Sequence, residues 1–416
     1  MKVDFKYGSG SISLDLPEER VLAVCQADDL PGVPDLRADI EAALDNPIGS
    51  FPLKSLATGK QSAAVVVDDI SRPVPYPGVL TPVLDQLIEA GIPQERITVI
   101  VATGLHRAMT QEELDRWIGP YKGCVRIINH QPDDRSQLVR IGFTSLGTHI
   151  GINRTFAEAE LKILTGDVDY HQFCGYGGGA KSVYPGLADH AAIETNHSRM
   201  EIPGTGMGRI EGNPVRLEIE EAGRMAGVDF ILNVVQNSRK EVVGAFAGDM
   251  IEAHRAGAKL IDRMYKVCVP ERADVVIASP GGYPKDIDLY QSQKALSAAR
   301  RIVKDGGKII ILAECREGHG SNLFDRWMRE ARSPEDIFRR IRERFTMGGH
   351  KAYQYVRDME GVEVCLCSSL PADQIEHYWL KPLHSPQEIL SKIGPDETII
   401  CLPDAALTCV DLTSKE

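Results

Sequence analysis

A glycine-rich stretch that also carries a lysine and a histidine is the segment of the chain best suited to chemistry. It runs from Asp167 through His171 and the glycines Gly177, Gly178 and Gly179 to Lys181. Glycines at this density favour a backbone that comes close to a ligand or adopts positive φ. The lysine suits an anionic or electrophilic ligand, and the histidine adds acid–base or metal-binding capacity. The alternative is a glycine-rich surface loop with unrelated neighbours.

The end of this stretch, Gly175-Tyr-Gly-Gly-Gly-Ala-Lys181-Ser, is similar at first sight to a phosphate-binding P-loop. That loop requires glycine directly before the lysine, whereas this chain has Ala180, so a nucleoside triphosphatase is disfavoured. The backbone amides of the glycines could still hold a phosphate. Lys181 could act as a point charge or as the nucleophile in a covalent bond to a cofactor.

Two shorter motifs place charged side chains after apolar runs. In Asp68-Asp69-Ile-Ser-Arg72-Pro, Arg72 can bind a carboxylate or phosphate with two parallel hydrogen bonds, and Asp69 could accept hydrogen bonds from ligand hydroxyls. In Thr103-Gly-Leu-His106-Arg107, His106 could be a general base or a metal ligand. The alternatives are an ion pair that closes a turn and an exposed loop histidine.

Two helix-like segments add further candidates. His190 and His197 are seven residues apart and could share a helical face, although His197 alone is a weak indication of a metal site. In the segment that contains Tyr290, Gln291 and Lys294, the last two are three residues apart and would face the same side, so Lys294 could hold a carboxylate. The alternative for this second segment is a solvated helix face.

Short β-branched runs alternate with helix-like patterns along the whole chain, which predicts an α/β fold with mainly parallel sheets. In such sheets ligands bind at the carboxyl ends of strands, where the motifs at residues 68–73, 102–107 and 167–186 lie. We also expect a helix over 79–90 and a capping box formed by Thr110 and Glu113. The predicted strands are 63–68, 97–102, 125–128, 161–165, 230–235, 275–278, 308–312, 363–366 and 398–402.

The 416 residues exceed one ordinary core and predict two domains, an N-terminal α/β domain over 1–269 and a C-terminal α/β domain over 270–416 that completes the substrate cleft. A net charge of −12 argues against binding to nucleic acid or to an anionic membrane. The nine scattered cysteines favour free thiols in a reducing compartment. The first residues lack an apolar signal segment, and no apolar run approaches the ~18 residues that span a bilayer, so we expect a cytoplasmic protein.

Taken together, these motifs resemble the nickel-pincer lactate racemase family. The resemblance implies two α/β domains with the active site in the cleft between them. It also implies a nickel-pincer nucleotide, nickel pyridinium-3,5-bisthiocarboxylic acid mononucleotide, in which two sulfur-bearing groups hold the metal, and partner proteins that make this cofactor. The matching segments are Asp68–Pro73, Ala102–Arg107, His171–Gly186, Asn196-His197, Tyr290-Gln291 and Lys294.

The resemblance also implies a role for each candidate. Lys181 would hold the cofactor through a thioamide link, and the glycine run would approach its phosphate, with Asp69 as a further cofactor contact. His197 would be the protein ligand to nickel, and His106 and His171 the paired acid–base residues. The substrate carboxylate would be bound by Arg72 and Lys294, with Tyr290 and Gln291 nearby.

The sequence departs from better-known members of the family at three positions. Cys174 and Gly177 stand where alanine and serine are expected, and Tyr184 precedes Pro185 where a smaller aliphatic residue is common. These differences could tune the pocket. Relatives with this framework act on other 2-hydroxy acids, including malate and sugar acids, so the substrate is a small 2-hydroxy acid whose identity stays open.

Inversion of a 2-hydroxy acid breaks a C–H bond beside a carboxylate. General acid–base catalysis contributes about 10²–10⁴-fold, which is too little for that proton. Oxidation to the ketone and return of the hydride avoids a carbanion but needs a cofactor, two bases and cations. The alternatives are a non-catalytic protein that binds the nickel nucleotide and a nicotinamide-dependent 2-hydroxyacid dehydrogenase, and the second is disfavoured because the chain lacks an early Gly-x-Gly-x-x-Gly motif.

Overall fold

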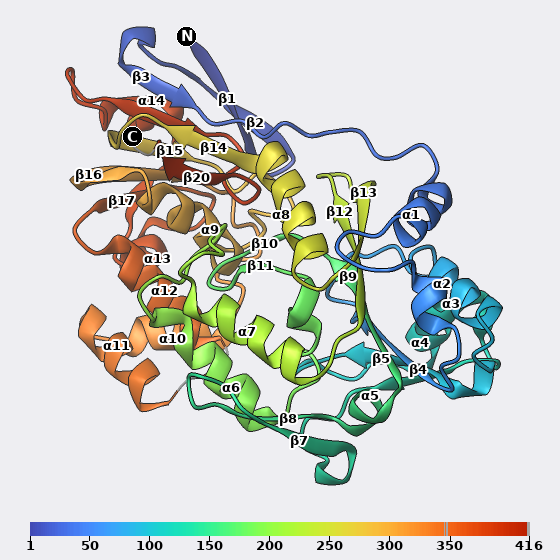
Figure 1. The fold of residues 1–416 in the computed structure, drawn as a ribbon. Coiled ribbons are helices and arrows are strands. Elements are labelled where there is room, and N and C mark those ends of the chain that lie inside the picture. The colour runs from blue at the N-terminus through green and yellow to red at the C-terminus, as the bar shows by residue number, and fades with distance from the viewer. Residues whose placement is uncertain (345, 347, 414–416) are drawn as a thin grey trace. The chain divides into compact units, whose positions relative to one another are not determined.

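The computed structural model describes residues 1–344, 346 and 348–413. The chain forms two compact units (Figure 1). Unit 1 combines Met1–Asp28 with the chain from Met264 onward, and unit 2 comprises Asp29–Arg263. Each unit is built on a six-stranded, mainly parallel sheet, which confirms the predicted α/β class.

The sheet of unit 2 has the strand order β13-β12-β9-β4-β5-β6. Only the edge strand β13 runs antiparallel to its neighbour, and the other pairs are parallel. Continuous β-branched runs such as that of β4 suit strands that are covered on both faces. The strands are β4 (Ala63–Asp68), β5 (Ile97–Ala102), β6 (Arg126–Asn129), β9 (Leu161–Asp167), β12 (Phe230–Gln236) and β13 (Val242–Gly248).

Successive side chains of this sheet point to opposite faces and enter two separate cores. Val65 and Val67 pack in one core with α1 (Leu36–Asp45), α2 (Leu53–Ala57), α3 (Leu80–Glu89) and α4 (Gln111–Ile118). Ala64 and Val66 pack in the other with α5 (Arg154–Glu158), α6 (His190–Ser198), α7 (Pro214–Met225) and the start of α8 (Glu252–Tyr265). The predicted capping box of Thr110 and Glu113 begins α4.

The sheet of unit 1 has the order β18-β17-β16-β15-β19-β3, and all of its neighbouring pairs are parallel. One face is covered by the hairpin of β1 and β2 together with α14 (Pro386–Ser391). The strands are β3 (Val21–Val24), β15 (Ala273–Ala278), β16 (Val303–Leu312), β17 (Glu363–Cys367), β18 (Lys381–Leu383) and β19 (Ile399–Leu402), and the hairpin strands are β1 (Lys2–Tyr7) and β2 (Gly10–Asp15).

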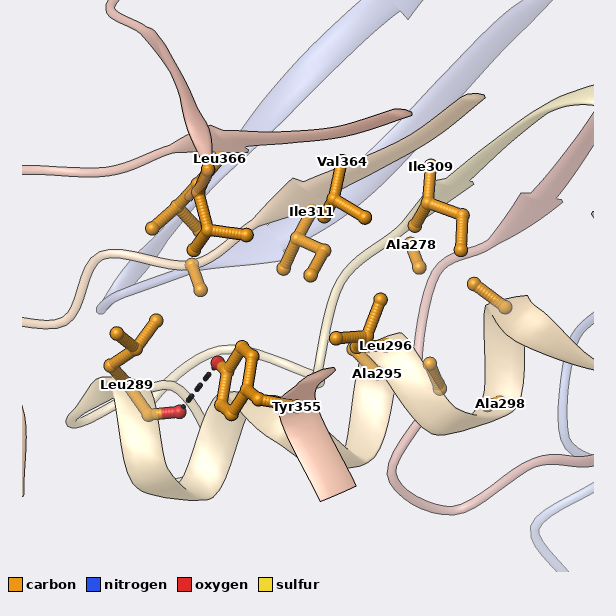
Figure 2. Packing of buried hydrophobic residues seen from close by; sticks show 14 of the residues in the cluster. Ala278, Leu289, Ala295, Leu296, Ala298, Ile309, Ile311, Tyr355, Val364 and Leu366 are labelled. Atoms are coloured by element: carbon orange, nitrogen blue, oxygen red, sulfur yellow. Dashed lines mark hydrogen bonds between the residues drawn. The ribbon is translucent and has the colours of Figure 1, made fainter. Parts of the chain in front are cut away.

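The other face of this sheet is covered by helices. Figure 2 shows Leu296 of α9 beneath the aliphatic side chains of β16 and β17. The hydroxyl of Tyr355 donates to the carbonyl oxygen of Leu289, at 2.9 Å, and so joins α12 to the start of α9. The helices are α9 (Leu289–Arg300), α10 (Asn322–Glu330), α11 (Pro334–Glu343), α12 (Gly349–Met359) and α13 (Ala372–His377).

Three small two-stranded sheets complete the fold. They are formed by β7 (Leu138–Phe143) with β8 (His149–Asn153), β10 (Tyr170–His171) with β11 (Gly175–Tyr176), and β14 (Lys266–Val269) with β20 (Cys409–Leu412). Within the described residues, no helix combines the length and apolar composition that crossing a bilayer requires. All nine cysteines are free, as expected.

The predicted domain boundary differs from this division in one respect. The boundary at 269/270 lies close to the end of unit 2 at Arg263, but residues 1–28, which we placed in the N-terminal domain, pack in unit 1. The reason is non-local pairing, because β3 forms the edge of the unit 1 sheet beside β19.

Candidate active site

The three predicted motifs of unit 2 follow three adjacent strands. In the order β9-β4-β5, Asp68 pairs with Ala102 and Val66 pairs with Leu164, so all three strands end at the same edge of the sheet. The segments after β4, β5 and β9 therefore begin next to one another. This confirms the expectation that the motifs lie at the carboxyl ends of parallel strands.

Asp69 and His106 form a hydrogen-bonded pair across two of these segments. Oδ2 of Asp69 lies 2.6 Å from Nδ1 of His106, and Oδ1 accepts from the backbone and hydroxyl of Ser71. Burial favours a raised pKa for Asp69, but the hydrogen bonds from His106 and Ser71 outweigh it and hold the pKa below its ordinary value. The ionised carboxylate accepts the proton of Nδ1, so the lone pair of His106 is on Nε2. The His106 side chain is 60% exposed, as a base that meets a ligand must be.

The backbone around His106 is shaped by the neighbouring motif. Gly104 has a φ of +52°, which favours glycine, and its amide donates to the carbonyl oxygen of Gly186 at 3.1 Å. The amide of His106 then closes a turn on Thr103 at 2.8 Å. The segments after β5 and after the glycine-rich loop are therefore joined directly.

The half-buried carboxyl group of Asp68 lies next to the buried Asp167, at the start of the glycine-rich segment. Oδ2 of Asp68 accepts from the backbone amide of Asp167 at 3.3 Å. Burial raises the pKa of both carboxyl groups, and the charge of Asp167 raises that of Asp68 further, whereas Arg72 and Lys181 lower both. Among the described residues, no hydrogen bond or ion pair engages the guanidinium of Arg72, so it is available to an anionic ligand.

Lys181 lies in a short 3₁₀ turn, Gly179–Ser182, that follows the glycines. Burial lowers the pKa of its amine, and the charge of Arg72 lowers it further. Its amine makes no hydrogen bond with the residues that the structure describes. A lysine whose neutral form is favoured in this way is a better nucleophile than an exposed one.

His171, Phe173 and His197 form a row of edge-to-face aromatic contacts. The ring centroids are 4.7 Å apart for His171 and Phe173 and 5.7 Å apart for Phe173 and His197. Nδ1 of His171 is buried and has no hydrogen-bond partner among the described residues. Burial, with the charges of Lys181 and Arg72, lowers the pKa of His171 well below its ordinary value, so this imidazole is neutral.

The orientation of His197 suits metal binding. Nδ1 lies 2.8 Å from the carbonyl oxygen of Ile193, to which it must donate, so the lone pair is on Nε2. Burial lowers the pKa of His197, and the charges of Lys181 and His106 lower it further, although the bond to Ile193 acts in the opposite direction. Lys181 thus lies within electrostatic reach of both His171 and His197, and His106 within reach of His197.

The other predicted histidine of α6 has separate partners. His190 begins the helix, and its Nδ1 lies 2.9 Å from Oδ1 of Asp133. Its side chain also contributes to a surface cavity of about 570 Å³ with Asp133 and Arg135. The shared helix that the spacing predicts is present, but His190 and His197 contact different residues.

The glycine run fits closely against protein atoms. The amide of Gly177 donates to the carbonyl oxygen of Asp169 at 2.7 Å, and that of Gly179 donates to Oδ1 of Asn233 at 2.8 Å. A Cβ atom at Gly178 would lie 2.6 Å from the carbonyl oxygen of Asp167, and φ at Gly178 is +69°. Close packing within the chain therefore requires glycine at 178, and two of the three amides are already engaged.

Buried polar residues that the sequence did not reveal support this loop from below. Nε2 of His254 lies 2.8 Å from the carbonyl oxygen of Gly177. Arg216 is fully buried, and its Nε donates to Oε1 of Glu220 at 2.8 Å while its Nη1 donates to the carbonyl oxygen of Tyr176 at 3.3 Å. Its Nη2 has no partner among the described residues. Both side chains come from helices whose polar residues would normally be read as exposed.

The remaining predicted residues lie in unit 1 on helix α9. Asp288 caps this helix by accepting from the amide of Gln291 at 2.7 Å. Tyr290 and Lys294 are one turn apart, and both are half-buried. The spacing that led us to Gln291 and Lys294 is therefore that of a real helix.

The residues that the structure describes do not build a metal site from protein side chains alone. Among the described residues, no group of three or more His, Cys, Asp or Glu side chains could hold a metal ion. A metal bound at Nε2 of His197 would therefore have to bring most of its ligands with it.

Comparisons with known proteins place the chain among its relatives. Residues 7–208 match the family described as the lactate racemase N-terminal domain, and residues 269–404 match the lactate racemase C-terminal domain. The lactate racemase of Thermoanaerobacterium thermosaccharolyticum is 34% identical over 82% of this chain and 81% of its own length. That of Lactiplantibacillus plantarum is 35% identical over 80% of each chain.

Solved structures extend the similarity to the fold. The lactate racemase apoprotein from Thermoanaerobacterium thermosaccharolyticum superposes with a TM-score of 0.88 at 30% identity and covers 99% of this chain and 100% of its own. A protein from Thermotoga maritima shares the fold with a TM-score of 0.62 at 19% identity over 92% of this chain and 100% of its own. The chain therefore belongs to the lactate racemase family, a family of isomerases.

Proposed function

We propose that this enzyme inverts the C2 centre of a small 2-hydroxy acid by hydride transfer to and from a nickel-pincer nucleotide, with His106 and His171 as the two acid–base residues. The observation that carries the proposal is the Asp69–His106 pair. It lies at the same sheet edge as a neutral His171 and within electrostatic reach of His197, which Lys181 also reaches.

The residues of unit 2 fit this cofactor. Lys181 offers an amine whose neutral form is favoured, as a covalent link requires. His197 offers one imidazole nitrogen with a fixed tautomer, which suffices for a metal already held by two sulfur-bearing groups. When bound, the nucleotide supplies a hydride acceptor, which no protein side chain provides. Asp69 and the amide of Gly178 are further candidates for contacts with its sugar and phosphate, whereas the amides of Gly177 and Gly179 already donate within the chain.

The chain's own residues would transfer the hydroxyl proton and bind the substrate carboxylate. Nε2 of His106 would take the proton of the C2 hydroxyl group from one enantiomer, and His171 would do the same for the other. In each direction the imidazole that takes the hydroxyl proton would be neutral at the start, and the opposite one would be protonated so that it can return a proton to the C2 oxygen. The lowered pKa of His171 favours its role as the proton acceptor. Arg72 would bind the substrate carboxylate, since its guanidinium is not engaged by the described residues. Tyr290, Gln291 and Lys294 are proposed as further substrate contacts on the basis of the family resemblance.

The first test measures whether the protein binds the cofactor and nickel. The protein is produced together with the proteins that make the cofactor, which are its expected partners, and its intact mass and nickel content are measured. We expect added mass on Lys181 and about one nickel ion per chain, lost in Lys181→Ala. His197→Ala should lose nickel, whereas His190→Ala, a histidine of the same helix with other partners, should keep it. Equal nickel in both histidine variants would remove His197 from the metal site.

Activity is then measured with single enantiomers of 2-hydroxy acids, followed by chiral chromatography of the recovered acid. We expect racemisation without net formation of a keto acid. His106→Ala and His171→Ala should each abolish it while nickel content stays unchanged. A loaded wild-type protein that inverts no acid would instead support a non-catalytic nickel-nucleotide binder, and formation of NADH would support a dehydrogenase.

A further inference from the structure

His171 lies in a very short hairpin that needs support from the rest of unit 2. Its strand, β10, has two residues and pairs with the equally short β11. Nδ1 of its imidazole has no hydrogen-bond partner among the described residues, and the ring packs edge-to-face against Phe173. A two-stranded hairpin is at best marginally stable on its own. Contacts from outside the hairpin must therefore fix the place of this imidazole.

The hairpin presents two tyrosines on one face and His171 on the other. Its register pairs Tyr170 with Tyr176 and His171 with Gly175. Successive side chains of a strand point to opposite faces, so the two tyrosines lie on the same face. Their ring centroids are 5.4 Å apart, and Tyr176 is only 1% exposed. The tyrosine face is thus the one by which the hairpin is attached.

The attachment point is Asp262, near the end of helix α8. Its Oδ1 accepts a hydrogen bond from the hydroxyl of Tyr170 at 2.9 Å and from that of Tyr176 at 2.5 Å. Because both hydroxyls meet on one oxygen atom, the carboxylate fixes the two rings relative to α8. Tyr170 directly precedes His171, so the backbone that carries the imidazole is fixed with them.

The same face of α8 also holds the glycine-rich loop. His254, Ala258 and Asp262 follow one another at intervals of four residues, so they lie along one side of the helix. Nε2 of His254 lies 2.8 Å from the carbonyl oxygen of Gly177, and its ring meets that of Tyr176 edge-to-face at 6.3 Å. One helix face therefore holds both His171 and the glycines that precede the lysine.

We propose that Asp262 is a positioning residue, which sets the place of the His171 imidazole through the hydroxyls of Tyr170 and Tyr176. The proposal rests on the proposed function, because it takes His171 as an acid–base residue. A base must lie within hydrogen-bond reach of the proton that it takes, and a misplacement of about 1 Å can cost about 10²-fold in rate.

The first measurement is racemisation by the loaded enzyme. Asp262→Ala should lower kcat about 10- to 100-fold, with KM changed by less than about threefold and nickel content unchanged. Asp262→Asn keeps an oxygen with two lone pairs, which can accept from both hydroxyls, and should recover most of the rate. Lys259→Ala removes an exposed side chain of the same helix and should change nothing.

A mutant cycle tests whether the effect passes through the two hydroxyls. Tyr170→Phe combined with Tyr176→Phe should lower kcat about as much as Asp262→Ala does. Adding Asp262→Ala to this pair should lower kcat little further, since residues that act through one contact are not additive. Losses that multiply would show that Asp262 acts by another route and would overturn the proposal.

NMR of isotope-labelled histidine in cofactor-free protein separates the positioning role from the proposed function. Asp262→Ala should shift the imidazole resonances of His171 and leave those of exposed His190 unchanged. Unchanged His171 resonances, with a loss confined to the free energy of unfolding, would make Asp262 merely structural and overturn the proposal. If the resonances shift but His171→Ala keeps full activity, Asp262 still positions the imidazole, and the assignment of His171 as a base fails instead.

Discussion

Nδ1 of His106 lies 2.6 Å from Oδ2 of Asp69, which joins the segments after two adjacent parallel strands. The carboxylate is nearly buried, whereas the imidazole is largely exposed, so the protein holds one nitrogen and presents the other. This division fixes the tautomer of His106 and leaves Nε2 as the proton acceptor.

Loss of the Asp69 charge should therefore impair catalysis through His106. Asp69→Asn permits the wrong tautomer, and we expect kcat to fall by about 10²–10⁴-fold, the range of a general base. Ser71→Ala, which removes a hydroxyl that donates to the other oxygen of Asp69, should cost much less. Nickel content decides between two roles, because a variant that loses nickel as well as activity would place Asp69 in contact with the cofactor instead.

The neutral state of His171 can be checked in cofactor-free protein. Burial lowers its pKa most, and the charges of Lys181 and Arg72 lower it further. Replacing Arg72 by Met removes a positive neighbour, which favours protonation, so the pKa of His171 should rise. NMR titration of isotope-labelled histidine would follow it, with exposed His190 as the internal reference. An unchanged His171 titration in Arg72→Met would contradict the electrostatic account.

Local sequence patterns were sufficient to predict most strands of the two large sheets. The apolar, β-branched runs of β4 and β5 were predicted with their observed bounds, because continuous burial leaves a continuous pattern. β3 was missed, since it pairs with β19 at the other end of the chain, and the local hairpin of β1 and β2 was missed as well. The strand ends also predicted that the three motifs would lie near one another, because neighbouring parallel strands end at the same edge of a sheet.

The polar residues that support the site could not be predicted in the same way. Arg216 and His254 lie in helices where polar residues are usually solvated, so only the tertiary fold reveals their burial. The Asp69–His106 contact was also missed, although both residues were candidates, because a single sequence carries no information on contacts between loops. What the glycines of the loop touch was likewise visible only in three dimensions.

Arg216 should be among the most sensitive positions for stability in unit 2. Its guanidinium is fully buried beside Glu220, and removal of one partner of a buried ion pair costs about 3–5 kcal/mol. Arg216→Met should therefore lower the free energy of unfolding by that order. Arg255 also binds Glu220 but is 23% exposed, so Arg255→Met should cost clearly less. Urea unfolding of both variants measures the difference, and equal losses would show that burial is not the deciding factor.

Asp68 should make the stability of the protein depend on pH. Burial and the charge of Asp167 raise its folded-state pKa above the ordinary value of 3.8. The folded state then binds more protons than the unfolded state between these two pKa values, so this contribution to stability is complete below about pH 4 and is lost as pH rises through the folded-state pKa. Asp68→Asn keeps an acceptor for the amide of Asp167 but cannot ionise. Its advantage over the wild type in urea unfolding should grow from pH 5 to pH 8, whereas exposed Glu211→Gln should show no such trend. If the advantage is the same at both pH values, Asp68 is ionised throughout, and the charge of Arg72 outweighs the burial of the carboxyl group.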